Sequence, residues 1–101
     1  MSEPELDPVI HAPKRLKAMA ILVASDSAEF RFLRESIGIR DADLSKQMST
    51  LEEAGYITIR KTKPGRGSST WYKVTKKGRS AFTRHSDALR ELLSEPNKLQ
   101  T

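Results

Sequence analysis

The segment from Asp41 to Tyr56 (DADLSKQMSTLEEAGY) constrains the fold of this chain most, because its apolar residues recur at helical spacing. Leu44, Met48 and Leu51 are four and three positions apart, which places them on one buried stripe of a helix. The opposite face carries short, mostly uncharged side chains: Asp43, Ser45, Lys46, Gln47, Ser49 and Thr50. The segment therefore predicts an amphipathic helix with an outer face rich in hydrogen-bond donors and acceptors.

A second predicted helix, from Ala28 to about Ile37, precedes this one. Its apolar residues Phe30, Leu33 and Ile37 share one face. Gly38 is well suited to end the helix, and a link of two residues then leads into the next helix. Two helices joined by a short turn that contains glycine, the second more polar than the first, are typical of a helix-turn-helix.

Two β-prone runs follow the helix pair. Residues 56–62 alternate between apolar and polar side chains, and residues 70–74 form a second run rich in aromatic and β-branched side chains. Between them lies a basic segment that contains Pro64-Gly65, which is a turn-forming pair. The two runs are therefore predicted to form a β-hairpin with a flexible, cationic tip.

The positive charge of the chain is concentrated around this hairpin. Residues 60–79 contain eight Lys or Arg residues and no acidic residue, whereas the remaining chain has ten basic and thirteen acidic residues. A mildly acidic body with one concentrated basic segment is the distribution expected of a protein that binds a polyanion.

Two further helices are predicted to flank these elements. Pro13 opens the first, with Leu16, Met19 and Val23 on its apolar stripe, and Asp7-Pro8 predicts a short helical turn before it. Thr75 caps the last, which runs from Lys76 to about Ser94. The order of elements predicts an α+β fold, a winged helix-turn-helix of three helices, a two-stranded wing and a C-terminal helix. We expect residues 7–95 to form this domain, residues 1–6 a flexible N-terminal tail and residues 96–101 a C-terminal tail.

At this level the chain resembles the small single-domain winged-helix transcriptional regulators of the MarR/ArsR-like superfamily. The resemblance extends over LDPVIHAPKRLKAMAIL, EFRFLRESIGIRDADLSKQMSTLEEAGYITIRK and GRGSSTWYKVTKKGRSAF. Its most diagnostic parts are LSKQMSTLEEAGY and the T-x-x-G-R-x-A-F pattern from Thr75 to Phe82. It implies a homodimeric DNA-binding regulator, a repressor or an activator, with a recognition helix at residues 41–54 and a wing at residues 63–69. Of the two roles we favour the repressor.

One position departs from the family pattern. Arg40 stands before the recognition helix, where such proteins often have a capping Ser or Thr. Either Asp41 and Asp43 supply negative charge that suits the helix dipole, or Asp41 itself caps the helix. Arg40 can instead point to a DNA phosphate.

The predicted DNA contacts fall into two groups, because base edges and phosphates require different side chains. Gln47 can pair bidentately with adenine and Lys46 can contact guanine, whereas Asp43 can accept from cytosine or only serve the helix terminus. The expected base-contact residues are Asp43, Ser45, Lys46, Gln47 and Thr50. The expected phosphate and wing residues are Arg40, Lys61, Lys63, Arg66, Ser68 and Ser69. The alternative is an ordinary solvated helix face and a solubilising hairpin tip.

The first and last long helices carry more apolar surface than a small core requires. We expect this surface to form a two-fold homodimer interface that separates the recognition helices by about 34 Å, so that they read a pseudo-palindrome. The residues predicted to contribute are Leu16, Met19, Leu22, Phe82, His85, Leu89, Leu92 and Leu93. The alternative is that both helices pack within a monomer.

Several classes of function are disfavoured by the sequence. The chain has no cysteine, neither His11 nor His85 has a second ligand at metal-binding spacing, and no nucleophile–base pattern is visible. We therefore expect no metal, no cofactor and no enzymatic activity. No apolar run suits a membrane span and the acidic N-terminus is not a signal peptide, which predicts a soluble, cytoplasmic protein without membrane contact.

Two further possibilities stay open at this point. Winged helices also serve as protein-docking modules that do not bind DNA, and the same helix face or wing can provide the contact. Members of the family that the chain resembles often bind small anions or phenols between the DNA-binding lobe and the dimer helices. A small-molecule effector is therefore compatible with the resemblance, although the sequence identifies no pocket for one.

Overall fold

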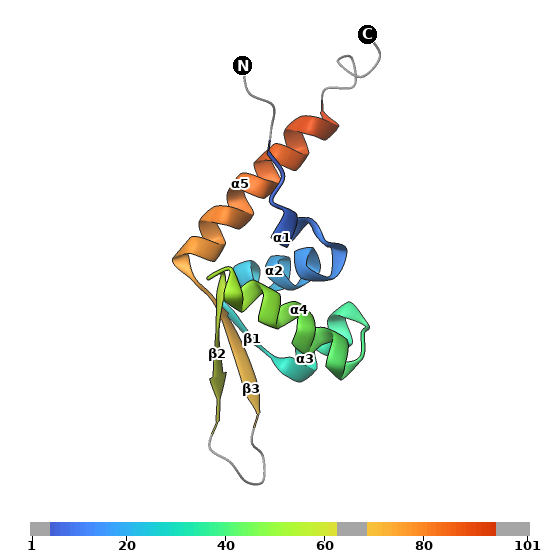
Figure 1. The fold of residues 1–101 in the computed structure, drawn as a ribbon, viewed down its shortest axis with the longest axis vertical. Coiled ribbons are helices and arrows are strands. Elements are labelled where there is room, and N and C mark those ends of the chain that lie inside the picture. The colour runs from blue at the N-terminus through green and yellow to red at the C-terminus, as the bar shows by residue number, and fades with distance from the viewer. Residues whose placement is uncertain (1–4, 63–68, 95–101) are drawn as a thin grey trace.

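The fold is known from a computed structural model that describes residues 5–62 and 69–94. Within these residues the chain forms helices α1 (Pro8–His11), α2 (Pro13–Ser25), α3 (Phe30–Ile37), α4 (Asp41–Glu53) and α5 (Lys76–Leu93), and strands β1 (Ser27–Glu29), β2 (Ile57–Lys61) and β3 (Thr70–Val74). Helices α2, α3 and α4 pack beside the sheet, the β2–β3 hairpin projects from one end, and α5 extends toward the other (Figure 1). None of the described helices is long and apolar enough to cross a bilayer.

The core lies where α2 and α4 meet the sheet. The three apolar residues predicted to share one stripe of α4, Leu44, Met48 and Leu51, are fully buried, and Met19 and Leu22 of α2 are buried with them. Each such side chain stabilises the fold by about 1.5–3 kcal/mol relative to an exposed position. The core therefore fixes which face of α4 points to solvent.

A third strand, β1, was missed by the sequence interpretation, which placed Ala28 and Glu29 in a helix. In the structure Ala28 pairs with Tyr72 and Glu29 with Trp71, so the sheet order is β1-β3-β2. Asp26 has φ +73° and ends α2, which redirects the chain along the free edge of β3. The hydrogen bonds offered by that edge outweigh the local helical preference, and α3 begins only at Phe30.

The predicted hairpin is confirmed. β2 and β3 are antiparallel, with Ile57 opposite Val74 and Ile59 opposite Tyr72. Ile57, Tyr72 and Val74 are buried on the face that meets the helices. Of the predicted wing at residues 63–69, only Ser69 lies within the described residues.

The T-x-x-G pattern has a structural explanation at the start of α5. The Thr75 hydroxyl accepts a hydrogen bond from the Gly78 N–H (2.9 Å) and donates one to the Gly55 carbonyl (2.7 Å). A Cβ atom on residue 78 would lie 2.2 Å from the carbonyl oxygen of Tyr56, so only glycine fits there. This junction fixes α5 against the turn that follows α4.

Candidate nucleic-acid interface

The outer face of α4 presents the polar surface that the sequence predicts. Ser45, Lys46 and Ser49 are exposed, and the buried stripe lies behind them. Thr50 is half-buried, and its hydroxyl donates to the Lys46 carbonyl (3.2 Å) within the helix. Ser49 was part of the predicted polar face but was not among the expected base contacts, although the helical period places it beside Lys46 and Ser45.

The N-terminus of α4 has Arg40 as its N-cap, and no side-chain hydrogen bond caps the helix there. The alternative in which Asp41 caps the helix is therefore wrong. Asp41 lies inside the first turn and accepts a hydrogen bond from Arg34 of α3 (2.9 Å). Asp41 and Asp43 place negative charge at the positive end of the helix dipole, as the first alternative expects. Arg40 is exposed and remains a predicted phosphate contact.

Asp43 and Gln47 belong to a group of side chains that joins α2 to α4. We call this group, made of Lys14, Arg15, Asp43 and Gln47, the α2–α4 polar cluster. The Gln47 amide N–H donates to Asp43 Oδ1 (2.9 Å), and Arg15 Nη1 donates to Gln47 Oε1 (2.7 Å). Lys14 pairs with the second oxygen of Asp43. Hydrogen bonding to Gln47, followed by the interaction with Lys14, lowers the pKa of Asp43.

The described part of the hairpin carries exposed cations at Arg60 and Lys61, at the end of β2, and at Lys73 on β3. Ser69 is held at the base of the wing, where its backbone N–H donates to the Thr62 hydroxyl (2.6 Å) and its own hydroxyl accepts from the Trp71 indole (3.2 Å). The other predicted wing residues, Lys63, Arg66 and Ser68, lie outside the described residues.

The basic segment is less unbalanced in space than in sequence. Asp26 accepts hydrogen bonds from Lys73 (2.9 Å) and Arg79 (2.6 Å), although both cations lie in the acid-free run of residues 60–79. The hydrogen bond from Lys73, followed by the one from Arg79, lowers the pKa of Asp26. Asp26 therefore partly compensates the positive charge beside β1. It does not pair with Arg60 or Lys61, whose charge it leaves uncompensated.

The residues predicted to form a dimer face separate into two groups. Leu93 and Leu92 are 74% and 37% exposed, and Leu16, Phe82 and Leu89 are half-buried. Met19, Leu22 and His85 are buried inside the single chain, so the expectation that they contact a partner is corrected. Helix α2 is more deeply embedded than its amphipathic pattern indicates, because α4, α5 and the sheet all pack around it.

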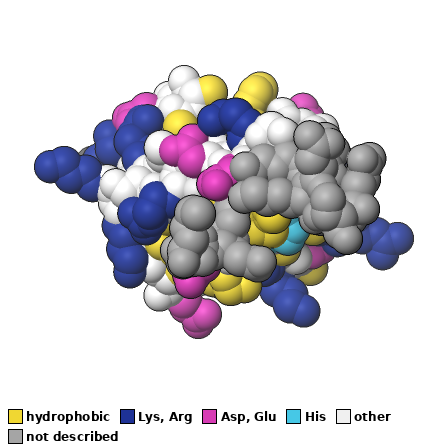
Figure 2. Space-filling model, turned by 90° about the horizontal axis from the view of Figure 1, so that it is seen from above, with side chains coloured by type: hydrophobic (Ala, Val, Ile, Leu, Met, Phe, Trp, Pro, Cys, Tyr) yellow, Lys and Arg dark blue, Asp and Glu magenta, His cyan; other side chains and the backbone are white. Residues whose placement is uncertain are grey.

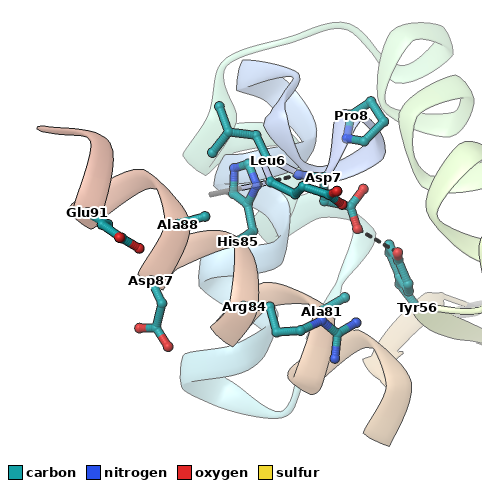
Figure 3. A pocket seen from close by; sticks show the side chains of 11 residues that line it. Leu6, Asp7, Pro8, Tyr56, Ala81, Arg84, His85, Asp87, Ala88 and Glu91 are labelled. Atoms are coloured by element: carbon teal, nitrogen blue, oxygen red, sulfur yellow. Dashed lines mark hydrogen bonds between the residues drawn. The ribbon is translucent and has the colours of Figure 1, made fainter. Parts of the chain in front are cut away.

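His85 belongs to a second group of polar side chains, which the sequence interpretation missed. We call this group, made of Asp7, His11, Tyr56 and His85, the α1–α5 polar cluster; Figure 3 draws Asp7, Tyr56 and His85. The backbone N–H of Asp7 donates to His85 Nδ1 (2.9 Å), and the Tyr56 hydroxyl donates to Asp7 Oδ2 (2.6 Å). His85 Nε2 lies 3.3 Å from His11 Nδ1. Because Nδ1 of His85 accepts a hydrogen bond, its proton must be on Nε2 in the neutral form.

The environment of this cluster shifts its ionisation. Burial, together with the neighbouring His11, lowers the pKa of His85. Burial raises the pKa of Asp7, but the hydrogen bond from Tyr56 and those from the first N–H groups of α1 bring it below its usual value. The hydrogen bond to Asp7 raises the pKa of Tyr56. The only sequence signal for this cluster was Asp7 as the cap of α1, which the structure confirms.

A groove of about 640 Å³ opens beside the α1–α5 polar cluster. Asp7, Tyr56 and His85 line it together with Arg84 and Glu91 of α5. Seen from above, a histidine side chain lies next to hydrophobic side chains, and Lys and Arg side chains lie toward the rim of the view (Figure 2). In residues 5–62 and 69–94, no group of three or more His, Asp or Glu side chains is arranged to hold a metal ion.

Comparisons with known proteins identify the family. The family described as "Winged helix DNA-binding domain" matches residues 14–93. An uncharacterised protein of Methanocaldococcus jannaschii, MJ0432, is 31% identical over 74 residues, which are 73% of this chain and 80% of that protein. The fold is similar to a transcriptional regulator homologue from Pyrococcus horikoshii, with a TM-score of 0.79, 21% identity and 84% of each chain covered.

A third similarity is to a solved regulator of the MarR family. The zinc-responsive MarR-family member ZitR of Lactococcus lactis superposes with a TM-score of 0.62 and 17% identity, covering 98% of this chain and 67% of that chain. The predicted resemblance to winged-helix transcriptional regulators is thereby confirmed, as is the α+β winged helix-turn-helix fold. With its helix-turn-helix of α3 and α4, its β2–β3 hairpin and its match over residues 14–93, this chain belongs to the winged helix DNA-binding domain family.

Proposed function

We propose that this DNA-binding regulator reads a pseudo-palindromic operator as a homodimer and represses transcription. The observation that carries the proposal is the outer face of α4, which exposes Ser45, Lys46 and Ser49 while the opposite face is fixed in the core. A major groove about 12 Å wide admits one helix, and side chains of these types read base edges there. Gln47 and Thr50 lie at the edges of this face and complete the proposed base-contact set, and Asp43 adjoins it through its hydrogen bond with Gln47.

The wing supplies the second half of the proposed interface. Arg60 and Lys61 are exposed where β2 leads into the wing, and Lys63 and Arg66 follow them in the sequence. Cations at these positions would neutralise phosphates and provide affinity that does not depend on sequence. In this proposal the wing sets affinity and register, and α4 sets selectivity.

Dimerisation is supported by the apolar surface of α5. Leu92 and Leu93 are exposed near its end, and Leu89 is half-buried one turn earlier. A two-fold contact along this helix would bury these leucines in both copies and set two recognition helices about one DNA turn, 34 Å, apart. Repression would follow when the operator overlaps a promoter, because the bound dimer excludes the polymerase.

An effector would have a suitable place in the groove beside the α1–α5 polar cluster. The groove is wide enough for a small molecule, and it borders both α5 and the turn that follows α4. ZitR, which has a similar fold, is described as zinc-responsive, so ligand-dependent regulation occurs in this structural class. We propose that an effector bound in this groove would act on the relative position of α1 and α5.

The test of DNA reading is selection of bound duplexes from a random library with the full-length protein. The proposal expects an enriched sequence with two-fold symmetry and half-sites about one helical turn apart. In a gel-shift assay with random duplex DNA, the absence of any retarded complex at low salt would reject DNA binding and favour the docking-module alternative. That alternative has one specific observation in its support, the 56% exposed Phe32 on α3. Sedimentation equilibrium would test the dimer independently of DNA.

The wing assignment is tested by a matched pair of charge removals. Replacing Lys61 by Ala should weaken binding to all sequences alike and reduce the slope of log K against log salt by about 0.9, as expected for one lost phosphate contact. Arg90→Ala, an equal loss of charge at an exposed position of α5, should leave the slope unchanged. Equal slopes in both variants would show that Lys61 does not contact a phosphate.

A further inference from the structure

The α2–α4 polar cluster fixes a side chain that the proposed function assigns to base reading. Gln47 has a carbonyl oxygen and an amide nitrogen that a DNA base can distinguish, and their order decides which base edge it matches. Arg15 donates to Gln47 Oε1 (2.7 Å), and the Gln47 amide donates to Asp43 Oδ1 (2.9 Å). The oxygen therefore lies toward the guanidinium and the nitrogen toward the carboxylate.

The reverse order is electrostatically disfavoured at both ends. A flipped Gln47 amide would place its NH₂ group against the Arg15 guanidinium and its oxygen against the Asp43 carboxylate. A donor would then face a donor and an acceptor would face an acceptor, so both hydrogen bonds would be lost. Lys14 holds the second oxygen of Asp43, so the carboxylate stays in place.

Arg15 is itself held by the protein. Its Nε donates to the Val9 carbonyl (2.6 Å) while Nη1 donates to Gln47. Both bonds use the planar fork of the guanidinium, a geometry that a lysine ammonium does not reproduce. The direction from which Arg15 approaches Gln47 is therefore set by α1, the short helix that contains Val9.

We infer that Arg15, on α2 rather than on the recognition helix, is a positioning residue for base selection, which acts by fixing the order of donor and acceptor in Gln47. The inference rests on the proposed function, because Gln47 must read a base for its orientation to matter. In the amide, each contact uses one hydrogen or one lone pair, so one donor and one acceptor remain for a base. Asp43 is then an orienting group for Gln47 and not a contact to cytosine.

The test compares base preference in the full-length protein and its variants. A position of the selected operator that loses its preference in Gln47→Ala is identified first, and affinities are then measured for the preferred base and its alternatives. We expect wild-type discrimination of roughly tenfold or more at that position. In Arg15→Ala the ratio of the affinity for the preferred base to that for its alternatives should fall several-fold. In the Arg15→Ala, Gln47→Ala double variant this ratio should equal that of Gln47→Ala alone.

Matched variants separate positioning from loss of charge or of fold. Lys17→Ala removes the same charge from an exposed position on α2 and should keep the wild-type ratio. Arg15→Lys should not restore the ratio, because the single nitrogen of an ammonium does not reproduce the separate positions of Nε and Nη1, which donate to Val9 and Gln47. The ratio is insensitive to a reduced folded fraction, since that fraction affects all duplexes alike. Should Arg15→Ala fail to fold, Asp43→Asn serves instead, because an amide there no longer enforces one order in Gln47, and the ratio should fall.

Three outcomes would overturn the inference, and they differ in what they leave standing. If Gln47→Ala loses the preference while Arg15→Ala and Asp43→Asn retain it, Gln47 reads a base without being positioned by its neighbours. If Gln47→Ala retains every preference, the inference fails while DNA reading by other residues of α4 stands. If the wild-type protein enriches no sequence, the proposed function and the inference fail together.

Discussion

The two polar clusters use the same hydrogen-bond chemistry in different surroundings. The α1–α5 polar cluster is built on His85, which is 1% exposed, whereas Lys14 and Asp43 in the α2–α4 polar cluster have side chains 48% and 30% exposed. Water can replace a partner lost from the second cluster more readily than one lost beside the buried His85 of the first. The comparison indicates that the first cluster stabilises the fold and that the second orients side chains at the proposed DNA interface.

The largest effect is expected when the buried member of the α1–α5 polar cluster is removed. His85→Ala leaves the Asp7 N–H without its acceptor and opens a cavity, so we expect a loss of about 2–4 kcal/mol in the free energy of unfolding. His11→Ala changes an exposed ring in the same cluster and should cost much less. Urea denaturation at matched protein concentration measures both. Similar losses in the two variants would contradict the role assigned to burial.

A pH titration sharpens the same comparison. Because the folded-state pKa of His85 is lowered, the unfolded chain binds a proton first as the pH falls below about 6.5. Stability should therefore be complete above that pH and decline from there toward the lower folded-state value. Asp43 has a pKa below that of an ordinary aspartate, so its protonation affects stability only at more acidic pH.

The measurement is the free energy of unfolding between pH 7.5 and 5. His85→Asn, which carries no titrating ring, should flatten the decline in this window, and Asp43→Asn should leave it as in wild type. A decline that persists unchanged in His85→Asn would assign it to another group.

The smallest effect on stability is expected in the α2–α4 polar cluster. Lys14→Ala removes an exposed ion pair, and such pairs contribute little because water screens them. We expect the melting temperature to stay within roughly 2 °C of wild type, while base preference at the Gln47 position weakens because Asp43 is held less firmly. Differential scanning calorimetry and the operator titration together check this. A large loss of stability without a change in preference would reverse the roles of the two clusters.

Much of the fold follows from patterns that act over one or two helical turns. The Leu44, Met48 and Leu51 stripe predicted the buried side of α4, and Gly38 predicted the end of α3, where its φ is +79°. These predictions succeed because periodicity and backbone stereochemistry are local properties. β1 was missed because its pairing partner, β3, lies far along the chain, and because neither Ala28 nor Glu29 is a residue type that indicates a strand.

The candidate site divides in the same way. The exposed positions of Ser45 and Lys46 follow from the helical period, whereas the engagement of Gln47 by Arg15 and of Asp26 by Lys73 does not. Each of these pairs is formed by residues on different elements, so its existence depends on how the helices and strands pack. The predicted dimer role of Met19 and Leu22 failed for the same reason, since an apolar stripe does not reveal what covers it.

The sequence by itself determined the order of the helices and of the two hairpin strands, the inner and outer faces of α4 and the concentration of basic residues around the hairpin, because periodicity, turn chemistry and charge are properties of neighbouring residues. Only the tertiary structure decided which polar side chains meet. Asp7, Tyr56 and His85 come together because α1, the turn after α4, and α5 pack at one point, and Arg15 reaches Gln47 because α2 lies beside α4. Hydrogen bonds between side chains act over about 3 Å, a distance that only packing can establish.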